Sequence, residues 1–131
     1  MITVIKSPFV QYKLTILRNK KTSNTVFRQT MNEISYLIAS DVLQYVPFKK
    51  QTIETPLKKM SGTALGQPII LVPILRAGLG LLEGFAKFLP EAEKGHIGLY
   101  RDEQTYEPVE YLFKLPRFKN KKVLILDPML A

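Results

Sequence analysis

Apolar residues recur at helical spacing in the first third of the chain. Over residues 8–18 they return every three or four positions, and Ser7 followed by Pro8 is a typical helix start. A second run with the same period follows several candidate N-caps at 22–25 and continues to about Leu43. The pattern predicts two amphipathic helices whose apolar faces pack in a core.

Beyond residue 66 the pattern changes to short, continuous apolar runs. The run at 69–72 is typical of a parallel strand that is covered on both faces. Residues 96–100 predict a second strand, and 123–126 another strand of the buried type. Between the first two runs, residues 78–89 have helical character, and Pro90 ends that segment. Strand, helix and strand in this order predict the βαβ units of an α/β sheet with right-handed crossover.

Two segments are less regular. From Pro47 to Gly66 few apolar residues stand among proline, glycine, lysine and threonine, so we expect a connection or edge element with a short strand at 52–55. Between Arg101 and Pro116 residues with β propensity flank a possible turn, which predicts a protruding β-hairpin rather than a helix.

The composition is that of one core. With 131 residues, 46% of them hydrophobic, we expect a single domain over 1–131, with a helical part at 1–46. The first half of an α/β core would occupy 67–131 and include a hairpin arm at about 100–117. There is no charged leader followed by a long apolar run, and the longest apolar stretch is too short for a bilayer, so we expect a cytoplasmic protein.

The net charge and the residue types limit which partners and which kinds of catalytic or metal site are possible. The formal net charge of +8 suggests an anionic partner, which is a nucleic acid, a membrane surface or a small polyphosphate. The lysines come as scattered pairs without a dense block, so a solvated surface is the simpler interpretation and nucleic acid is disfavoured. With one histidine and no cysteine, zinc sites and Ser-His-Asp hydrolysis have nothing to build on.

Candidate ligand-binding residues follow the predicted strands, where loops converge at the carboxyl edge of a parallel sheet. Arg76 offers a bidentate fork to phosphate, and Arg101 places a second guanidinium near the same edge, although both are equally consistent with surface ion pairs. Asp127 suits sugar hydroxyls or a hydrated magnesium ion, and is as often a helix cap. Gly78 and Gly80 allow either ligand approach or close helix packing.

Five segments, in this order and spacing, resemble the uracil phosphoribosyltransferase family: VPILRAGLG at 72–80, GHIGLYRDE at 95–103, EPVEY at 107–111, KLP at 114–116 and LDPMLA at 126–131. The resemblance implies an incomplete type I phosphoribosyltransferase fold, with N-terminal helices, a parallel sheet of βαβ units and a protruding β-hairpin arm. It also implies a reaction that joins uracil to phosphoribosyl pyrophosphate and gives UMP and pyrophosphate.

The resemblance also implies roles for particular residues. Arg76 and Arg101 would hold the pyrophosphate, Mg²⁺ would accompany it, and the arm at about 100–117 would join two or more copies of the chain. The loop for ribose and its 5′-phosphate would comprise Asp127, Pro128, Met129, Leu130 and Ala131.

In the family this loop continues after Ala131, and the uracil-recognition segment comes later still. We therefore expect the chain to be an N-terminal portion that is inactive alone. Two alternatives remain open at this stage, a noncatalytic fragment that binds RNA or dimerises, and a related phosphoribosyltransferase for another base.

Overall fold

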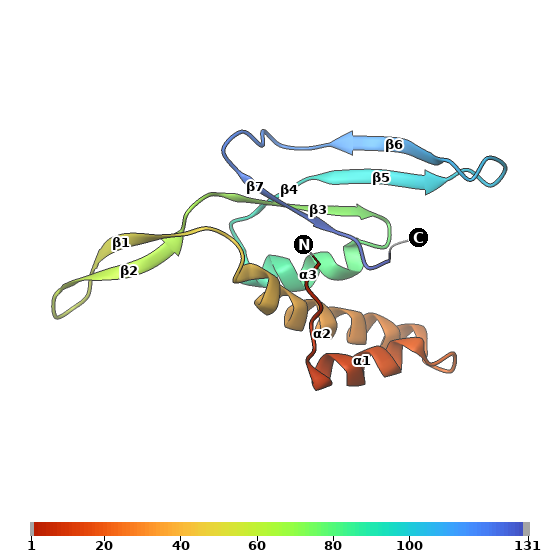
Figure 1. Cartoon of the computed structure of the whole chain (residues 1–131), viewed down its shortest axis with the longest axis horizontal. Helices are drawn as coiled ribbons and strands as arrows, with labels where there is room; N and C mark the ends of the chain where they lie inside the picture. Colours follow the sequence, from red (N-terminus) through yellow and green to blue (C-terminus); the bar gives the residue numbers. More distant parts are fainter. Residues whose placement is uncertain (1, 130–131) are drawn as a thin grey trace.

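The computed structural model of the protein describes residues 2–129 (Figure 1). Both predicted N-terminal helices are confirmed, as α1 (Pro8–Arg18) and α2 (Asn24–Leu43). Each begins at a serine N-cap, because the Ser7 hydroxyl accepts a hydrogen bond from the Val10 N–H and the Ser23 hydroxyl from the Val26 N–H. Among the described residues no helix combines the length and the apolar character that crossing a membrane requires.

The remaining elements alternate strands with one further helix. They are β1 (Phe48–Glu54), β2 (Lys59–Leu65), β3 (Ile69–Leu75), α3 (Leu79–Phe88), β4 (Glu93–Lys94), β5 (His96–Arg101), β6 (Pro108–Lys114) and β7 (Lys122–Leu126). The three strands and the helix that the apolar runs predicted are therefore present, with ends within a few residues of the expected positions.

The main sheet is built around β3. Strands β4 and β5 pair with β3 in parallel, β7 also pairs with β3 in parallel, and β6 pairs antiparallel with β5. Strand β3 lies inside the sheet, because the successive segments β4 and β5 both pair with it and β7 also pairs with it, over Ile69 to Pro73. Four of its residues, Ile69 to Val72, are at most 4% exposed. The predicted mostly parallel α/β sheet is confirmed.

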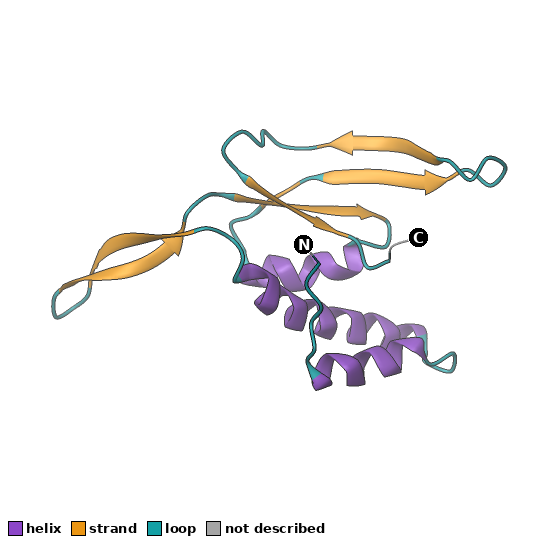
Figure 2. Ribbon diagram, viewed as in Figure 1, coloured by secondary structure: helices purple, strands orange, loops and turns teal. Residues whose placement is uncertain are grey.

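All three helices lie on the same side of the sheet (Figure 2). Helix α3 packs against the sheet, α2 packs on α3, and α1 packs on α2. The core cluster joins Ile69 and Leu71 of β3 to Leu81 and Phe85 of α3. The two helices meet closely because α3 carries Gly84 where any side chain would lie within 2.2 Å of the Ser35 hydroxyl of α2.

Strands β1 and β2 form an antiparallel hairpin that the sequence interpretation missed. It projects from the rest of the protein at the left of Figure 1. We expected one short strand at 52–55, whereas seven residues of each strand pair, from Phe48 opposite Leu65 to Glu54 opposite Lys59. All of β1 is exposed, so neither face needs to be apolar and the alternation that marks a half-buried strand is weak.

A protruding hairpin is present as predicted, but its bounds differ from 101–116, because its first strand is β5 and residues 102–107 form its turn. The hairpin is therefore continuous with the main sheet. Its strands β5 and β6 pair from His96 opposite Lys114 to Arg101 opposite Pro108, with a register shift between Gly98 and Leu99. Strand β5 pairs with β3 only near its beginning, so the outer part of the hairpin extends past the end of β3 (Figure 1).

Candidate functional site at the carboxyl edge of the sheet

Two of the three candidate residues follow the ends of adjacent strands at the carboxyl edge. Strands β3 and β7 are parallel neighbours, and Pro73 is level with Leu126. Arg76 follows the last residue of β3 and Asp127 follows the last residue of β7, so both leave the sheet at the same edge. The edge therefore presents a guanidinium and a carboxylate on adjacent strand ends.

Arg101 lies farther out. Leu75, the last residue of β3, is level with Gly98 of β5, and Arg101 is three residues further along. At about 3.3 Å per strand residue, this places its backbone roughly 10 Å beyond that level. Arg101 thus lies on the projecting part of the hairpin. For Arg101 and Arg76 to bind the same ligand, the ligand would have to be long, as a polyphosphate is, or the hairpin would have to move toward the sheet edge.

The loop after β3 is tied to the end of β7. The Gly78 N–H donates to the Ile74 carbonyl at 2.8 Å, which closes a tight turn around Arg76. A Cβ atom at Gly78 would lie only 2.3 Å from the Leu126 carbonyl oxygen. Close packing thus accounts for Gly78, and likewise for Gly80, where a Cβ would approach the Met31 side chain to 2.9 Å. The peptide bond before Arg76 is cis.

Helix α3 adds a favourable field at this edge. It begins at Leu79, directly after the loop, so its N-terminal end lies at the carboxyl end of β3. The N-terminus of a helix carries a partial positive charge, which stabilises nearby anions. Together with Arg76, this end of the helix makes the edge suited to a negatively charged ligand.

The hairpin tip beside Arg101 is ordered by Asp102. Its Oδ1 atom accepts hydrogen bonds from the N–H groups of Gln104 at 2.9 Å and Thr105 at 2.8 Å. These bonds, with that from Thr105 the largest influence, hold the pKa of Asp102 below its ordinary value. An Arg101 guanidinium nitrogen donates to the Tyr106 carbonyl at 3.3 Å. The aspartate followed by polar residues is a turn signal that could have been recognised.

Asp127 forms a short turn of its own. Its Oδ1 accepts a hydrogen bond from the Met129 N–H at 3.3 Å, and the side chain is exposed. Pro128 lies between them. The two remaining residues of the predicted loop, Leu130 and Ala131, lie outside the described residues.

His96 opens β5 and is level with Lys114 of β6. Its neighbour Ile97 is level with Ile74 of β3, two residues before Arg76.

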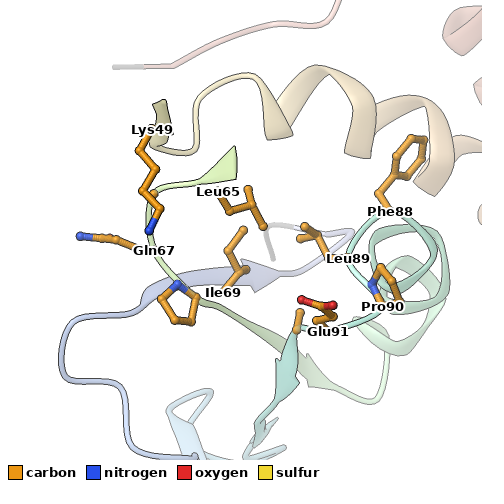
Figure 3. A pocket seen from close by; sticks show the side chains of 11 residues that line it. Lys49, Leu65, Gln67, Ile69, Phe88, Leu89, Pro90 and Glu91 are labelled. Carbon is orange, nitrogen blue, oxygen red and sulfur yellow. The ribbon is translucent and has the colours of Figure 1, made fainter. Parts of the chain in front are cut away.

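The surface of the described residues also has several hollows. One of about 470 Å³ lies at the amino end of β3, opposite the candidate site (Figure 3). Lys49 and Gln67 lie on one side of it, Glu91 on the other, and Ile69 and Leu89 between them. The second, of about 430 Å³, is an apolar groove beside β7, called here the β7 groove. Its lining comprises Leu14, Leu17, Met31, Ile34, Ile38, Val42, Leu81, Phe85 and residues 123–128.

The order of the parallel strands and the charged residues at their carboxyl ends define the class of α/β protein that binds anionic ligands at a sheet edge. The sequence model of the uracil phosphoribosyltransferase family matches residues 4–131. The chain therefore belongs to the uracil phosphoribosyltransferase family.

Individual relatives agree with this membership. A curated uracil phosphoribosyltransferase from Levilactobacillus brevis is 47% identical over 130 residues, which cover 98% of this chain and 62% of the relative. One from Legionella pneumophila (strain Paris) is 48% identical over 132 residues, covering 99% and 62%.

Among solved structures, that of the AQ2163 protein from Aquifex aeolicus superposes with a TM-score of 0.91 at 35% identity, over 100% of this chain and 64% of that one. The chain thus spans somewhat less than two thirds of the length of these relatives.

Proposed function

We propose that this chain supplies the phosphoribosyl pyrophosphate-binding half of an enzyme that transfers the phosphoribosyl group to uracil. The products would be UMP and pyrophosphate, in pyrimidine salvage in the cytoplasm. One observation carries the proposal: Arg76 and Asp127 follow the ends of adjacent parallel strands, at the edge where α3 begins.

The proposed roles follow from the charge that develops in the reaction. A bond forms between N1 of uracil and C1′ of the ribose, and the bond from C1′ to the pyrophosphate oxygen breaks. The electron pair leaves with the pyrophosphate, and the N1 proton is released. Arg76, with its bidentate fork, would hold the leaving pyrophosphate through charge-assisted hydrogen bonds. Fixed cationic groups lower such a barrier by positioning and electrostatics and require no covalent nucleophile.

Arg101 would bind the same pyrophosphate from the hairpin. In the structure its guanidinium contacts the Tyr106 carbonyl at the tip. Because its backbone stands beyond the end of β3, the hairpin would have to bend toward the edge for both guanidinium groups to reach one ligand. Asp127 would accept hydrogen bonds from the ribose hydroxyls, and Pro128, Met129, Leu130 and Ala131 would continue the loop around the sugar phosphate.

Mg²⁺ would enter with the substrate. No group of three or more metal-ligating side chains occurs within residues 2–129. Magnesium is commonly held by one or two carboxylates together with substrate phosphates, and the exposed Asp127 fits that arrangement. When bound, the ion would neutralise charge on the pyrophosphate.

A binding measurement and an assay on the purified chain test this proposal. We expect the 131-residue chain to bind phosphoribosyl pyrophosphate in the presence of Mg²⁺, and to form little UMP, because it spans 62% of the length of the Levilactobacillus brevis relative. Arg76→Met should abolish the binding. Arg28→Met, the same substitution at an exposed position of α2, should leave the binding intact. Binding that survives Arg76→Met would contradict the site. Substitution of other bases for uracil in the completed enzyme would test base choice.

One observation favours a second role, in binding RNA or in self-association. Lys49, Lys50, Lys58 and Lys59 are all exposed on the projecting β1–β2 hairpin. A polyanion would be bound through counterion release, so the affinity for single-stranded RNA would fall steeply with salt. Absence of binding at low salt would remove this alternative.

We also propose that two or more copies of the chain associate through the hairpin of β5 and β6. Tyr111 and Phe113 are more than half exposed on that hairpin. Sedimentation of the wild type and of Phe113→Glu would test this, with a smaller species expected for the variant.

A further inference from the structure

Positive charge is concentrated in one stretch of the chain, which runs from the last residue of β6 to the first residue of β7. This stretch, residues 114–122, is called here the basic loop. Five of its nine residues are lysine or arginine and none is acidic, and no other window of nine residues in the chain holds as many cations. The lysines of the whole chain come as scattered pairs, but Arg117 and Lys119 make this stretch dense. A local excess of positive charge attracts a polyanion.

The basic loop has a defined turn at its centre. The Lys121 N–H donates to the Phe118 carbonyl at 3.0 Å, and Asn120 has a φ of 62°, a left-handed conformation that asparagine adopts more readily than most residues. The Lys122 N–H donates to the Pro68 carbonyl at 2.9 Å, which fastens the end of the loop to the segment before β3. The loop therefore presents its side chains from an ordered backbone.

Four of the five cations are available to a ligand. Lys121 forms an ion pair with Glu93. No ion pair within residues 2–129 includes the other four, and all of them are exposed, namely Lys114, Arg117, Lys119 and Lys122. Such cations neutralise the phosphates of a nucleic acid and release its counterions, which is the main source of affinity that does not depend on sequence.

Phe118 adds an aromatic ring among these cations. It stands between Arg117 and Lys119 in the sequence and is 60% exposed. Aromatic rings beside cations are typical of proteins that bind single-stranded nucleic acid, because bases stack on the rings while the cations contact the backbone phosphates. An anionic membrane fits less well. Phe118 is the one large apolar side chain exposed within 114–122, whereas membrane-surface segments bury a broad apolar face.

The basic loop lies at the end of the sheet opposite the candidate site. Lys122 is level with Ile69, the first residue of β3, whereas Arg76 follows the last. In Figure 1 the connection between β6 and β7 lies at the end of the sheet from which the β1–β2 hairpin projects. We propose that the basic loop binds single-stranded nucleic acid, with a base stacked on Phe118 and phosphates at the four exposed cations. This gives the second role proposed above, RNA binding, a site distinct from the lysines of the β1–β2 hairpin.

Fluorescence anisotropy with a labelled oligouridylate of roughly twelve nucleotides measures this binding. We expect the 131-residue chain to bind it at low salt. The slope of log Kd against log salt should be about 3, because each of the four cations accounts for about 0.7 on a single strand. Phe118→Ala should weaken binding about tenfold and leave the slope unchanged, because it removes a stacking surface and no charge. The double variant Arg117→Gln with Lys119→Gln should lower the slope by roughly 1.4.

Matched variants separate the basic loop from general effects. Phe27→Ala removes an exposed phenylalanine beside Arg28 on α2 and should bind like the wild type. The double variant Lys58→Gln with Lys59→Gln removes two charges from the β1–β2 hairpin and should weaken binding less than the double variant of the loop. Phe118→Ala should retain phosphoribosyl pyrophosphate binding, because Phe118 lies far along the sheet from the strand ends that carry the candidate site.

Amide resonances give a second reading that does not depend on a variant, since those of residues 117–122 should shift when oligouridylate is added. The proposal is overturned if the wild type does not bind at low salt, if Phe118→Ala binds equally well, or if the shifts lie elsewhere. A larger loss in the hairpin variant than in the loop variant would also overturn it and would assign RNA binding to the hairpin. Binding to phosphatidylserine vesicles that requires Phe118, without binding of oligouridylate, would identify a membrane site instead.

The two functions fail separately. A chain that binds oligouridylate as expected but does not bind phosphoribosyl pyrophosphate would leave the basic loop standing and would contradict the proposed transfer function. The opposite result would remove the nucleic-acid site alone.

Discussion

The packing of the β3–α3 loop on the end of β7 gives a sharp stability prediction. An alanine at Gly78 would place its Cβ 2.3 Å from the Leu126 carbonyl oxygen and 2.6 Å and 2.7 Å from the Ile74 nitrogen and oxygen. All three are backbone atoms, so no side chain can move aside. The backbone angles of Gly78, φ −59° and ψ −21°, suit alanine, so steric overlap is the only term against the substitution.

The magnitude follows from this geometry. Overpacking costs about 1–3 kcal/mol, and contact with three backbone atoms belongs at the upper end of that range. At backbone angles that alanine can adopt, replacing glycine by alanine returns up to about 1 kcal/mol, because it lowers the conformational entropy of the unfolded chain. We therefore expect Gly78→Ala to lower the free energy of unfolding by about 2 kcal/mol, and Tm by roughly 8 °C for a chain of this size.

Thermal and urea unfolding followed by far-ultraviolet circular dichroism measure this difference. Gly62→Ala is the matched control, because its Cβ would meet only the end of the exposed Ile53 side chain at 3.3 Å. That variant should stay within about 0.5 kcal/mol of the wild type. If the two variants unfold at the same midpoint, the close approach of the loop to β7 does not exist and the assignment of Gly78 to packing is wrong.

Three further predictions concern single side chains. Arg76→Lys should weaken phosphoribosyl pyrophosphate binding by roughly tenfold in a calorimetric titration, because an ammonium cannot make the bidentate contact; unchanged affinity would remove Arg76 from the site. Ser35→Ala should cost about 1 kcal/mol in urea unfolding, because the buried hydroxyl donates to the Leu81 carbonyl, and a neutral result would show that the hydrogen bond has no net value. The pKa of Asp102 is lower in the folded chain than its ordinary value of 3.8. The ionised carboxylate therefore stabilises the turn above pH 3.8, and this stabilisation is lost as the pH falls through the lower folded pKa. The Thr105 amide resonance should follow this titration, and a midpoint at or above 3.8 would contradict the prediction.

The geometry of the edge has a consequence for mutagenesis of the site. Arg76 is held by a turn that Gly78 closes and that rests on the Leu126 carbonyl, so a change at either position would disturb the guanidinium without touching the ligand. Loss of binding in such a variant should accompany loss of stability. Arg76→Lys, in contrast, should change affinity alone, which separates contact with the ligand from support of the loop.

Sequence reasoning succeeded where a signal is local. The ends of α1 and α3 were predictable because Ser7 with Pro8 starts one helix and Pro90 follows the other. Strand β3 was predictable because a strand covered on both faces must be apolar throughout. The apolar runs also located β5 and β7, although part of each is exposed. The β1–β2 hairpin was missed because it is exposed on both faces and its turn, at Pro56, lacks an Asn-Gly or Asp-Gly signature.

For the candidate site, too, some features could be predicted from the sequence and others could not. The sequence by itself determined which residues follow the strands, namely Arg76, Arg101 and Asp127, because strand ends can be read from apolar runs and their breakers. Only the tertiary structure decided that β7 joins β3 on the side away from β5, which places Arg76 and Asp127 after adjacent strand ends and leaves Arg101 on the projecting hairpin. Strand order and close approaches such as Gly78 to Leu126 depend on residues far apart in the chain, and no local pattern encodes which partners meet.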